Sequence, residues 1–182
     1  MVFLACDLAC LPIRQPVAGI NAKVSVLADA GWGQLVKNGK QDEGVFSDEL
    51  VDALAELVQS RWRPNPPPTW VTCVPSLGSP NLVPDFATRV AAKLGLPFDP
   101  VVRKIRSNQP QKMMRNSQQQ SRNLENVVEV GEIARLNEPV LLVDDVVDSR
   151  WTMTVIAALI RRAGGGIVYP IALAEAAPKI EG

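Results

Sequence analysis

An uninterrupted apolar run, Val140 to Val143, is the feature that most constrains the fold of this chain. Such a run leaves no polar face, so a strand here has to be covered on both sides, as strands of parallel sheets are. Helical patterns alternate with further short β-rich segments, which lie at 69–74, 100–105, 127–130 and 167–174. The sequence therefore predicts an α/β fold, a mainly parallel central sheet with helices on both faces.

Three segments have the apolar spacing and end signals of amphipathic helices. The first follows Ser47, a residue type typical of N-caps. The second begins near Pro84 and stops at Gly95, and the third covers 152–162. The proline-rich stretch 63–68 is expected to be an exposed, stiff linker between two elements.

A length of 182 residues favours one domain. Residues 1–45 show weak periodicity and turn formers such as Asn38-Gly39, so we expect a small N-terminal hood or extension there and the core at 46–182. Residues 100–124 carry six basic side chains and no acidic one. Their length predicts a mobile binding loop at about 106–124; the alternative is a solvated, partly disordered loop.

Composition excludes several classes of function. Without any histidine, the chain has no Ser-His-Asp triad, no histidine base and no imidazole metal ligand. A formal net charge of zero argues against strong electrostatic binding of nucleic acid or membranes. Three cysteines cannot complete a four-ligand zinc site unaided, so we expect buried thiols in a reducing compartment. No apolar stretch suggests a membrane span, and a cytoplasmic location is expected.

Two adjacent carboxylates, Asp144 and Asp145, follow the apolar run, and a turn then leads to Thr152 and an apolar helix. Backbone N–H groups at a turn and a helix N-terminus favour a phosphate group. Carboxylates beside them can accept hydrogen bonds from two neighbouring hydroxyls, as a ribose offers. The alternative is that the two acids only cap the turn.

The run VLLVDDVVDSRWTMT resembles the phosphoribosyl pyrophosphate motif of type I phosphoribosyltransferases, most closely the hypoxanthine-guanine branch. The resemblance implies that Asp144 and Asp145 hold the ribose hydroxyls and that Asp148 is the catalytic proton acceptor or donor. The 5′-phosphate would be surrounded by Ser149, Arg150, Trp151 and Thr152. Arg150 replaces the family glycine; it either strains the loop or supplies a bidentate phosphate contact. Trp151 is alternatively a packing residue.

Other segments resemble the same family. Pro75, Ser76 and Leu77 stand where the family has its pyrophosphate loop, although an ordinary turn would look the same. Substrate binding would also involve the basic side chains Arg103, Lys104 and Lys112, the first two of which are alternatively surface charges. Mg²⁺ would be held indirectly by Asp144 and Asp145, through substrate and water.

The segments WVTCVPSLGSPNLVPDFATRVA and PQKMMRNSQQQSRN, with the acidic motif, resemble the phosphoribosyltransferase-like region of some bacterial RecQ-family DNA helicases, and the segment order resembles ComF proteins. The matches cover about residues 30–175, and the chain has no GxxxxGK[ST] motor loop. Three hypotheses follow: a transferase acting on a purine-like base, a non-catalytic nucleotide- or phosphoribosyl pyrophosphate-sensing module, and a DNA-associated accessory domain. A parent or partner helicase and a homodimer are the macromolecular partners considered, with weak or no independent nucleic-acid binding.

Overall fold

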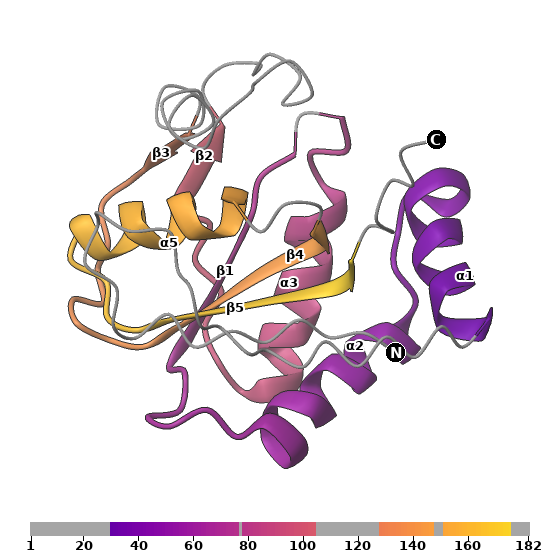
Figure 1. Ribbon diagram of the computed structural model, residues 1–182, viewed down its shortest axis with the longest axis horizontal. Coiled ribbons are helices and arrows are strands. Elements are labelled where there is room, and N and C mark those ends of the chain that lie inside the picture. The colour runs from indigo at the N-terminus through magenta and orange to yellow at the C-terminus, as the bar shows by residue number, and fades with distance from the viewer. Residues whose placement is uncertain (1–29, 77, 105–127, 148–150, 176–182) are drawn as a thin grey trace, which may run out of the picture.

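The computed structural model describes residues 30–76, 78–104, 128–147 and 151–175, with a three-stranded parallel sheet at the centre (Figure 1). The sheet has the order β1 (Trp70–Cys73), β4 (Val140–Val147), β5 (Val168–Glu175). Trp70 lies opposite Val140, which in turn lies opposite Val168. At the outer edge of β1, Val71 forms an isolated parallel bridge with Phe98. The predicted α/β class, with a mainly parallel central sheet, is confirmed.

One face of the sheet packs against α2 (Asp48–Glu56) and α3 (Leu82–Leu94). From the run of β4, Leu141 and Val143 point into this core. The hydroxyl of Tyr169 donates a hydrogen bond of 2.8 Å to the carbonyl oxygen of Pro66, which ties the irregular proline-rich stretch to β5. A π-helical segment, η2 (Leu57–Trp62), extends α2 up to that stretch.

The other face packs against α5 (Trp151–Arg162) and against a small two-stranded sheet of β2 (Val102–Lys104) and β3 (Val128–Val130). Val140 and Leu142 point into this second core. All four residues of the apolar run of β4 are fully buried, because each face of the strand has its own cover. Helices therefore lie on both faces, as predicted.

The described part of the segment predicted to be an N-terminal hood contains α1 (Ala30–Asn38) and the π-helical segment η1 (Gly39–Glu43). The arrowheads of β4 and β5 point toward the side on which α1 lies, and α1 contacts β5 (Figure 1). Asn38-Gly39 is helical, so the expectation of a turn there was wrong. Gly39 is buried, and it packs so closely on Phe46 that a Cβ at this position would lie 2.7 Å from Cδ1 of that ring.

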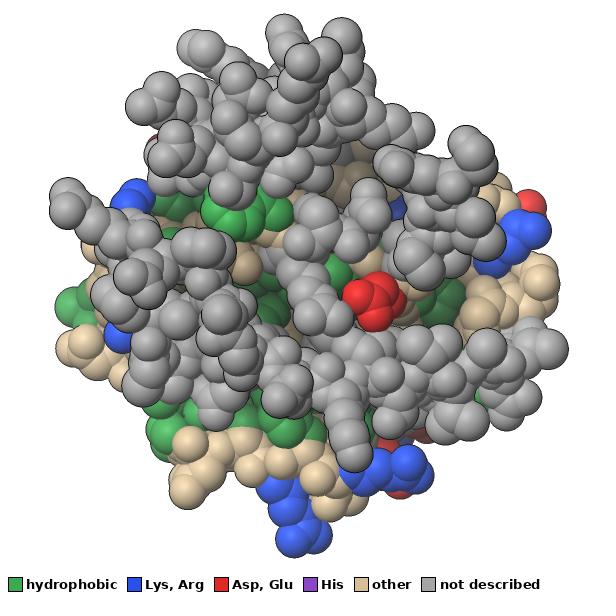
Figure 2. All heavy atoms as spheres, viewed as in Figure 1, with side chains coloured by type: hydrophobic (Ala, Val, Ile, Leu, Met, Phe, Trp, Pro, Cys, Tyr) green, Lys and Arg blue, Asp and Glu red, His purple; other side chains and the backbone are tan. Residues whose placement is uncertain are grey.

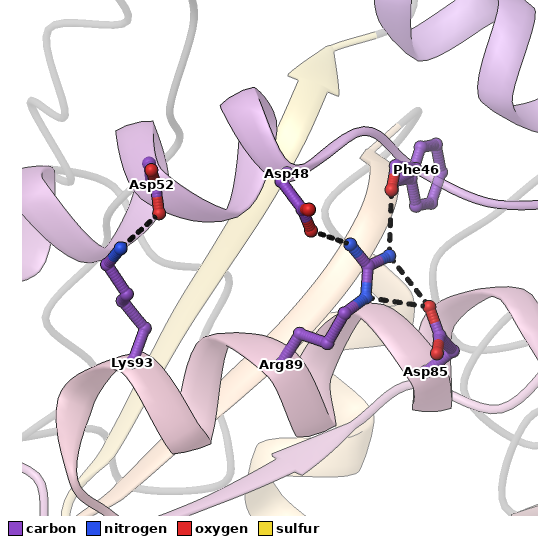
Figure 3. A network of polar contacts seen from close by, with 6 residues as sticks. All are labelled: Phe46, Asp48, Asp52, Asp85, Arg89 and Lys93. Atoms are coloured by element: carbon purple, nitrogen blue, oxygen red, sulfur yellow. Dashed lines mark hydrogen bonds and ion pairs between the residues drawn. The ribbon is translucent and has the colours of Figure 1, made fainter.

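Charged side chains join α2 to α3, and we call the set formed by Asp48, Asp52, Asp85, Arg89 and Lys93 the α2–α3 seam (Figure 3). The guanidinium of Arg89 contacts carboxylates of both helices, at 2.9 Å to Asp48 and 2.7 Å to Asp85. It also donates a hydrogen bond of 2.8 Å to the carbonyl oxygen of Phe46. Arg89 thus fixes the start of α2, and Phe46 two residues before it, on α3. A shallow cavity along the seam is lined by Asp48, Asp52, Arg89 and Lys93, together with Val51 and Ala92.

Other local expectations need correction. Ser47 stands at the N-cap position of α2, but its side chain makes no capping hydrogen bond and its buried Oγ has no partner among the described residues. The segment 100–105 contains β2, which pairs antiparallel with β3 and lies outside the parallel sheet. Gly95 does end α3, with a φ of 70°. In the described ranges, no helix is both long and apolar enough to cross a membrane.

Candidate functional site

The acidic pair lies inside β4, near its carboxyl end. The strand continues to Val147, so the turn expected directly after Asp145 was wrong. Asp144 lies opposite Ala172 of β5, and the two following valines pair with the end of β5 as well. Both carboxylates are therefore held by a strand that is paired on its β5 side up to its last residue. Such a frame fixes side chains more firmly than a free loop does.

The end of β1 lies beside this pair. Cys73 is in register with Val143, the residue before Asp144, and the N–H of Val74 donates a hydrogen bond of 2.9 Å to the carbonyl oxygen of Val143. The chain that leaves β1 through Pro75 and Ser76 therefore starts at the same edge of the sheet as the acids. Carboxyl ends of parallel strands are where such sheets bind ligands.

The N–H of Ser79 donates a long hydrogen bond, of 3.4 Å, to Oγ of Ser76. A ligand role for Pro75 and Ser76 stays a prediction. Leu77, the third residue expected in this loop, lies outside the described residues.

Each carboxylate accepts a hydrogen bond from the backbone immediately after it. Oδ1 of Asp144 accepts from the N–H of Asp145 at 2.8 Å, and Oδ1 of Asp145 accepts from the N–H of Val146 at 2.7 Å. These bonds fix the orientation of both side chains. They leave lone pairs on the carboxylate oxygens that can accept hydrogen bonds from a ligand.

Lys40, from η1, forms an ion pair of 2.6 Å with Oδ2 of Asp145. The carboxylate is largely enclosed, with a side-chain exposure of 12%, whereas that of Lys40 is 43%. Lys40 was not among the site residues predicted from the sequence. It is one lysine in a weakly periodic segment, about a hundred residues before the acids, and no local pattern points to it.

Electrostatics distinguish the two acids. Burial, together with the neighbouring charge of Asp145, raises the pKa of Asp144 from 3.8 to about 8, although the N–H of Asp145 and the charge of Lys40 act in the opposite direction. Burial, followed by the charge of Asp144, also raises the pKa of the Cys73 thiol, to about 12. Cys73 is thus an unreactive buried thiol, as expected for this chain. Perturbed carboxylates of this kind gather at functional sites.

Helix α5 begins at Trp151, one residue earlier than predicted, so Trp151 and Thr152 form its first turn. Trp151 is half-buried, and its indole Nε1 is enclosed without a hydrogen-bond partner among the described residues. The other residues expected around the phosphate or the base, Asp148, Ser149 and Arg150, lie outside the described ranges. The described structure therefore supplies both flanks of the predicted phosphate turn.

The predicted basic pair is not joined to the acids. Arg103 and Lys104 are the last two residues of β2, and Arg103 is exposed opposite Glu129 of β3. Among the described residues, no hydrogen bond or ion pair connects either side chain with Asp144 or Asp145. Lys112, the third predicted basic residue, falls outside the described part of the chain.

The donor set can be tested against Mg²⁺. The described residues contain no group of three or more acidic or thiol side chains that could enclose a metal ion. Two neighbouring carboxylates nevertheless suit Mg²⁺, which keeps several waters and commonly binds through one or two carboxylates plus substrate phosphates. Asp144 and Asp145 therefore fit an ion brought by a phosphorylated ligand better than an ion bound by the protein alone.

No protein-family model matches the chain, and no curated protein does. Its fold is similar to solved adenine phosphoribosyltransferases. One has 18% identity and a TM-score of 0.49, over 71% of this chain and 69% of that one. The Saccharomyces cerevisiae enzyme, in complex with an imino-altritol bisphosphate and adenine, has 16% identity and a TM-score of 0.48, over 71% of this chain and 68% of that one. The Leishmania tarentolae enzyme has 20% identity and a TM-score of 0.45, over 67% of this chain and 55% of that one. At these identities and TM-scores the likeness carries no conclusion about a ligand, and any ligand has to be inferred from the geometry of the site.

Proposed function

We propose that this chain is a phosphoribosyltransferase-type protein that binds phosphoribosyl pyrophosphate, with Mg²⁺, at the carboxyl end of β4. The observation that carries the proposal is the acidic pair itself. Asp144 and Asp145 are adjacent, oriented by backbone N–H groups and held in β4 next to the end of β1. Such a pair offers acceptors to a vicinal diol, and a turn before a helix N-terminus offers donors to a phosphate.

The reaction we propose is displacement of pyrophosphate by a purine-like base. The bond between C1′ and the pyrophosphate oxygen breaks, a bond from C1′ to a ring nitrogen forms, and the base nitrogen loses its proton. Asp148 is the proposed acceptor of that proton, on the sequence resemblance. The transition state would be oxocarbenium-like, as in glycoside hydrolysis, so the chain needs neither a nucleophile nor a histidine. Mg²⁺ would neutralise charge on the leaving group.

Calorimetry with phosphoribosyl pyrophosphate and Mg²⁺ tests the binding step. We expect saturable binding to the unmodified chain and a loss of affinity of about 10- to 100-fold in Asp145→Asn, because hydrogen bonds to a charged group are lost. The matched control is Asp52→Asn, an exposed aspartate of the α2–α3 seam, which should bind normally. Absence of binding to the unmodified chain would overturn the proposal. Equal affinities of Asp145→Asn and the unmodified chain would show that the ligand binds somewhere other than the acidic pair of β4.

A non-catalytic binding module on the same fold is the second candidate, favoured by Arg150 at the position of the family glycine. Pyrophosphate release, measured against a panel of purine and pyrimidine bases, separates the two. Release with one base supports the transferase. Tight binding without release for any base supports the sensor.

A nucleic-acid accessory domain has less support. On the face shown in Figure 2, the described Lys and Arg side chains that can be seen lie in separate places, mostly near its edge. The net charge of zero gives no general attraction to phosphates either. Association with a RecQ-family helicase, formation of a homodimer and a cytoplasmic location stay predictions from the sequence.

A further inference from the structure

We propose that Lys40 is a positioning residue of this site: it fixes Asp145 and supplies the positive charge that allows a phosphorylated sugar to bind beside two carboxylates. The inference rests on the proposed function. Its starting point is the 2.6 Å ion pair between Lys40 and Oδ2 of an enclosed carboxylate.

The position of Lys40 is determined by packing around Phe46. The ring of Phe46 is buried and meets Phe86 of α3 edge to face, with ring centroids 5.4 Å apart. Arg89 of the seam holds its carbonyl oxygen (Figure 3). Gly39 then lies directly against this residue, since a Cβ there would lie 2.7 Å from Cδ1 of Phe46 and 2.8 Å from the carbonyl oxygen of Val45. The residue after Gly39 is thereby brought to β4.

This support distinguishes the pair from most ion pairs on protein surfaces. Exposed pairs join two freely moving side chains and contribute little. Here the carboxylate is nearly enclosed and oriented by the N–H of Val146, and the backbone next to the lysine is packed into the core. The arrangement is thus fixed at both ends, and it links the hood to the acidic pair.

Charge explains why such a link is useful. The carboxylate of Asp145, which is paired with Lys40, repels an anionic sugar phosphate, and Asp144 adds to this repulsion as it ionises at higher pH; the repulsion is strong where water is excluded. An ammonium has three N–H donors, and the pair with Asp145 uses one of them. Lys40 is also partly exposed, so its remaining donors are accessible to a ligand that meets the carboxylates. It can offset the repulsion without removing the diol acceptors.

The test compares affinities for two ligands, phosphoribosyl pyrophosphate with Mg²⁺ and ribose 5-phosphate, by calorimetry on the full chain. We expect Lys40→Met to weaken both by about tenfold or more, because the diol and the sugar phosphate are common to both ligands. Lys40→Arg keeps the charge and should restore most of the affinity. Lys37→Met, which removes an exposed lysine of α1 one turn earlier, is the matched control and should bind like the unmodified chain.

The outcomes are separable. Unchanged affinity in a folded Lys40→Met variant, or a loss confined to the pyrophosphate-bearing ligand, would overturn the role of Lys40 at Asp145 while leaving the proposed function intact. Failure of the unmodified chain to bind either ligand would overturn both. Lys40→Gln retains a donor for Asp145 but carries no charge, so it should lose affinity for both ligands as Lys40→Met does. It replaces Lys40→Met in the test if that variant does not fold.

Discussion

Aspartates occur in two contrasting surroundings in this chain, the α2–α3 seam and the end of β4. In the seam, Asp48 and Asp85 are well exposed and share one guanidinium with ideal contact distances. At the end of β4, Asp144 and Asp145 are adjacent; Asp144 is half-buried, and Asp145 is nearly enclosed and paired with the partly exposed Lys40. The seam stabilises packing at low electrostatic cost, whereas the β4 pair is electrostatically unfavourable and is held in place by the surrounding strands. Unfavourable groups kept by a rigid frame are typical of functional sites.

Removing the charge of the seam should have the largest effect on stability. Arg89→Met breaks two ion pairs and the hydrogen bond to the carbonyl oxygen of Phe46, which is part of the core. We expect the free energy of unfolding to fall by about 1.5–3 kcal/mol, the range for hydrogen bonds to a charged group. Urea denaturation measures it.

Arg89→Met should leave ligand binding at the end of β4 unchanged only if the α2–α3 seam and the end of β4 are independent of each other. Because Phe46 also supports Gly39 and thus Lys40, we expect Arg89→Met to weaken ligand binding as well as folding. Normal affinity in a destabilised Arg89→Met variant would contradict this link between the regions.

Neutralising Asp144 should stabilise the folded chain, whereas Arg89→Met should destabilise it. The carboxyl group ionises near pH 3.8 in the unfolded chain and near pH 8 in the folded one, so folding favours the protonated form. The stability that this group contributes is complete below about pH 4 and is lost as the pH rises through about 8. Asp144→Asn keeps an oxygen for the N–H of Asp145 and has no charge to bury.

We therefore expect Asp144→Asn to raise the melting temperature at pH 8 by at least about 2–4 °C, the shift that roughly 1 kcal/mol gives in a chain of this size. The gain should shrink as the pH approaches 4. Thermal unfolding followed by circular dichroism at several pH values measures the trend. A gain that stays constant with pH, or a loss at pH 8, would show that Asp144 is ionised in the folded protein at no cost.

The contrast between the regions also marks what the sequence could predict. The strand from Val140, the stop of α3 at Gly95 and the place of the acids near a strand end follow from local patterns: apolar runs, glycine at a helix end, and polar residues after an apolar run. These features are decided by neighbours in the chain. The position of the acidic pair at a strand end can therefore be predicted from the sequence alone.

Contacts between distant segments could not be predicted in this way. Lys40 reaches Asp145 because Gly39 packs on Phe46, and in the sequence Asn38-Gly39 looks like a turn. The short strand β2 has too few residues to show a period, and its antiparallel partner is decided by tertiary pairing. One local signal was misleading as well: Ser47 occupies the N-cap position without its hydroxyl making the cap.

The smallest effect is expected at the outer end of the seam. Lys93 and Asp52 form an ion pair of 2.7 Å, but both side chains are more than half exposed, at 55% and 59%. Water screens the attraction, and holding two long side chains together costs entropy, so Lys93→Met should change the free energy of unfolding by less than about 0.5 kcal/mol. Urea denaturation of Lys93→Met beside Arg89→Met gives the comparison, since both variants replace a cation of α3 by the same uncharged residue. A loss at Lys93 as large as that at Arg89 would mean that the seam stabilises the chain through its total charge. The expected difference would mean that it does so through the one guanidinium that reaches the core.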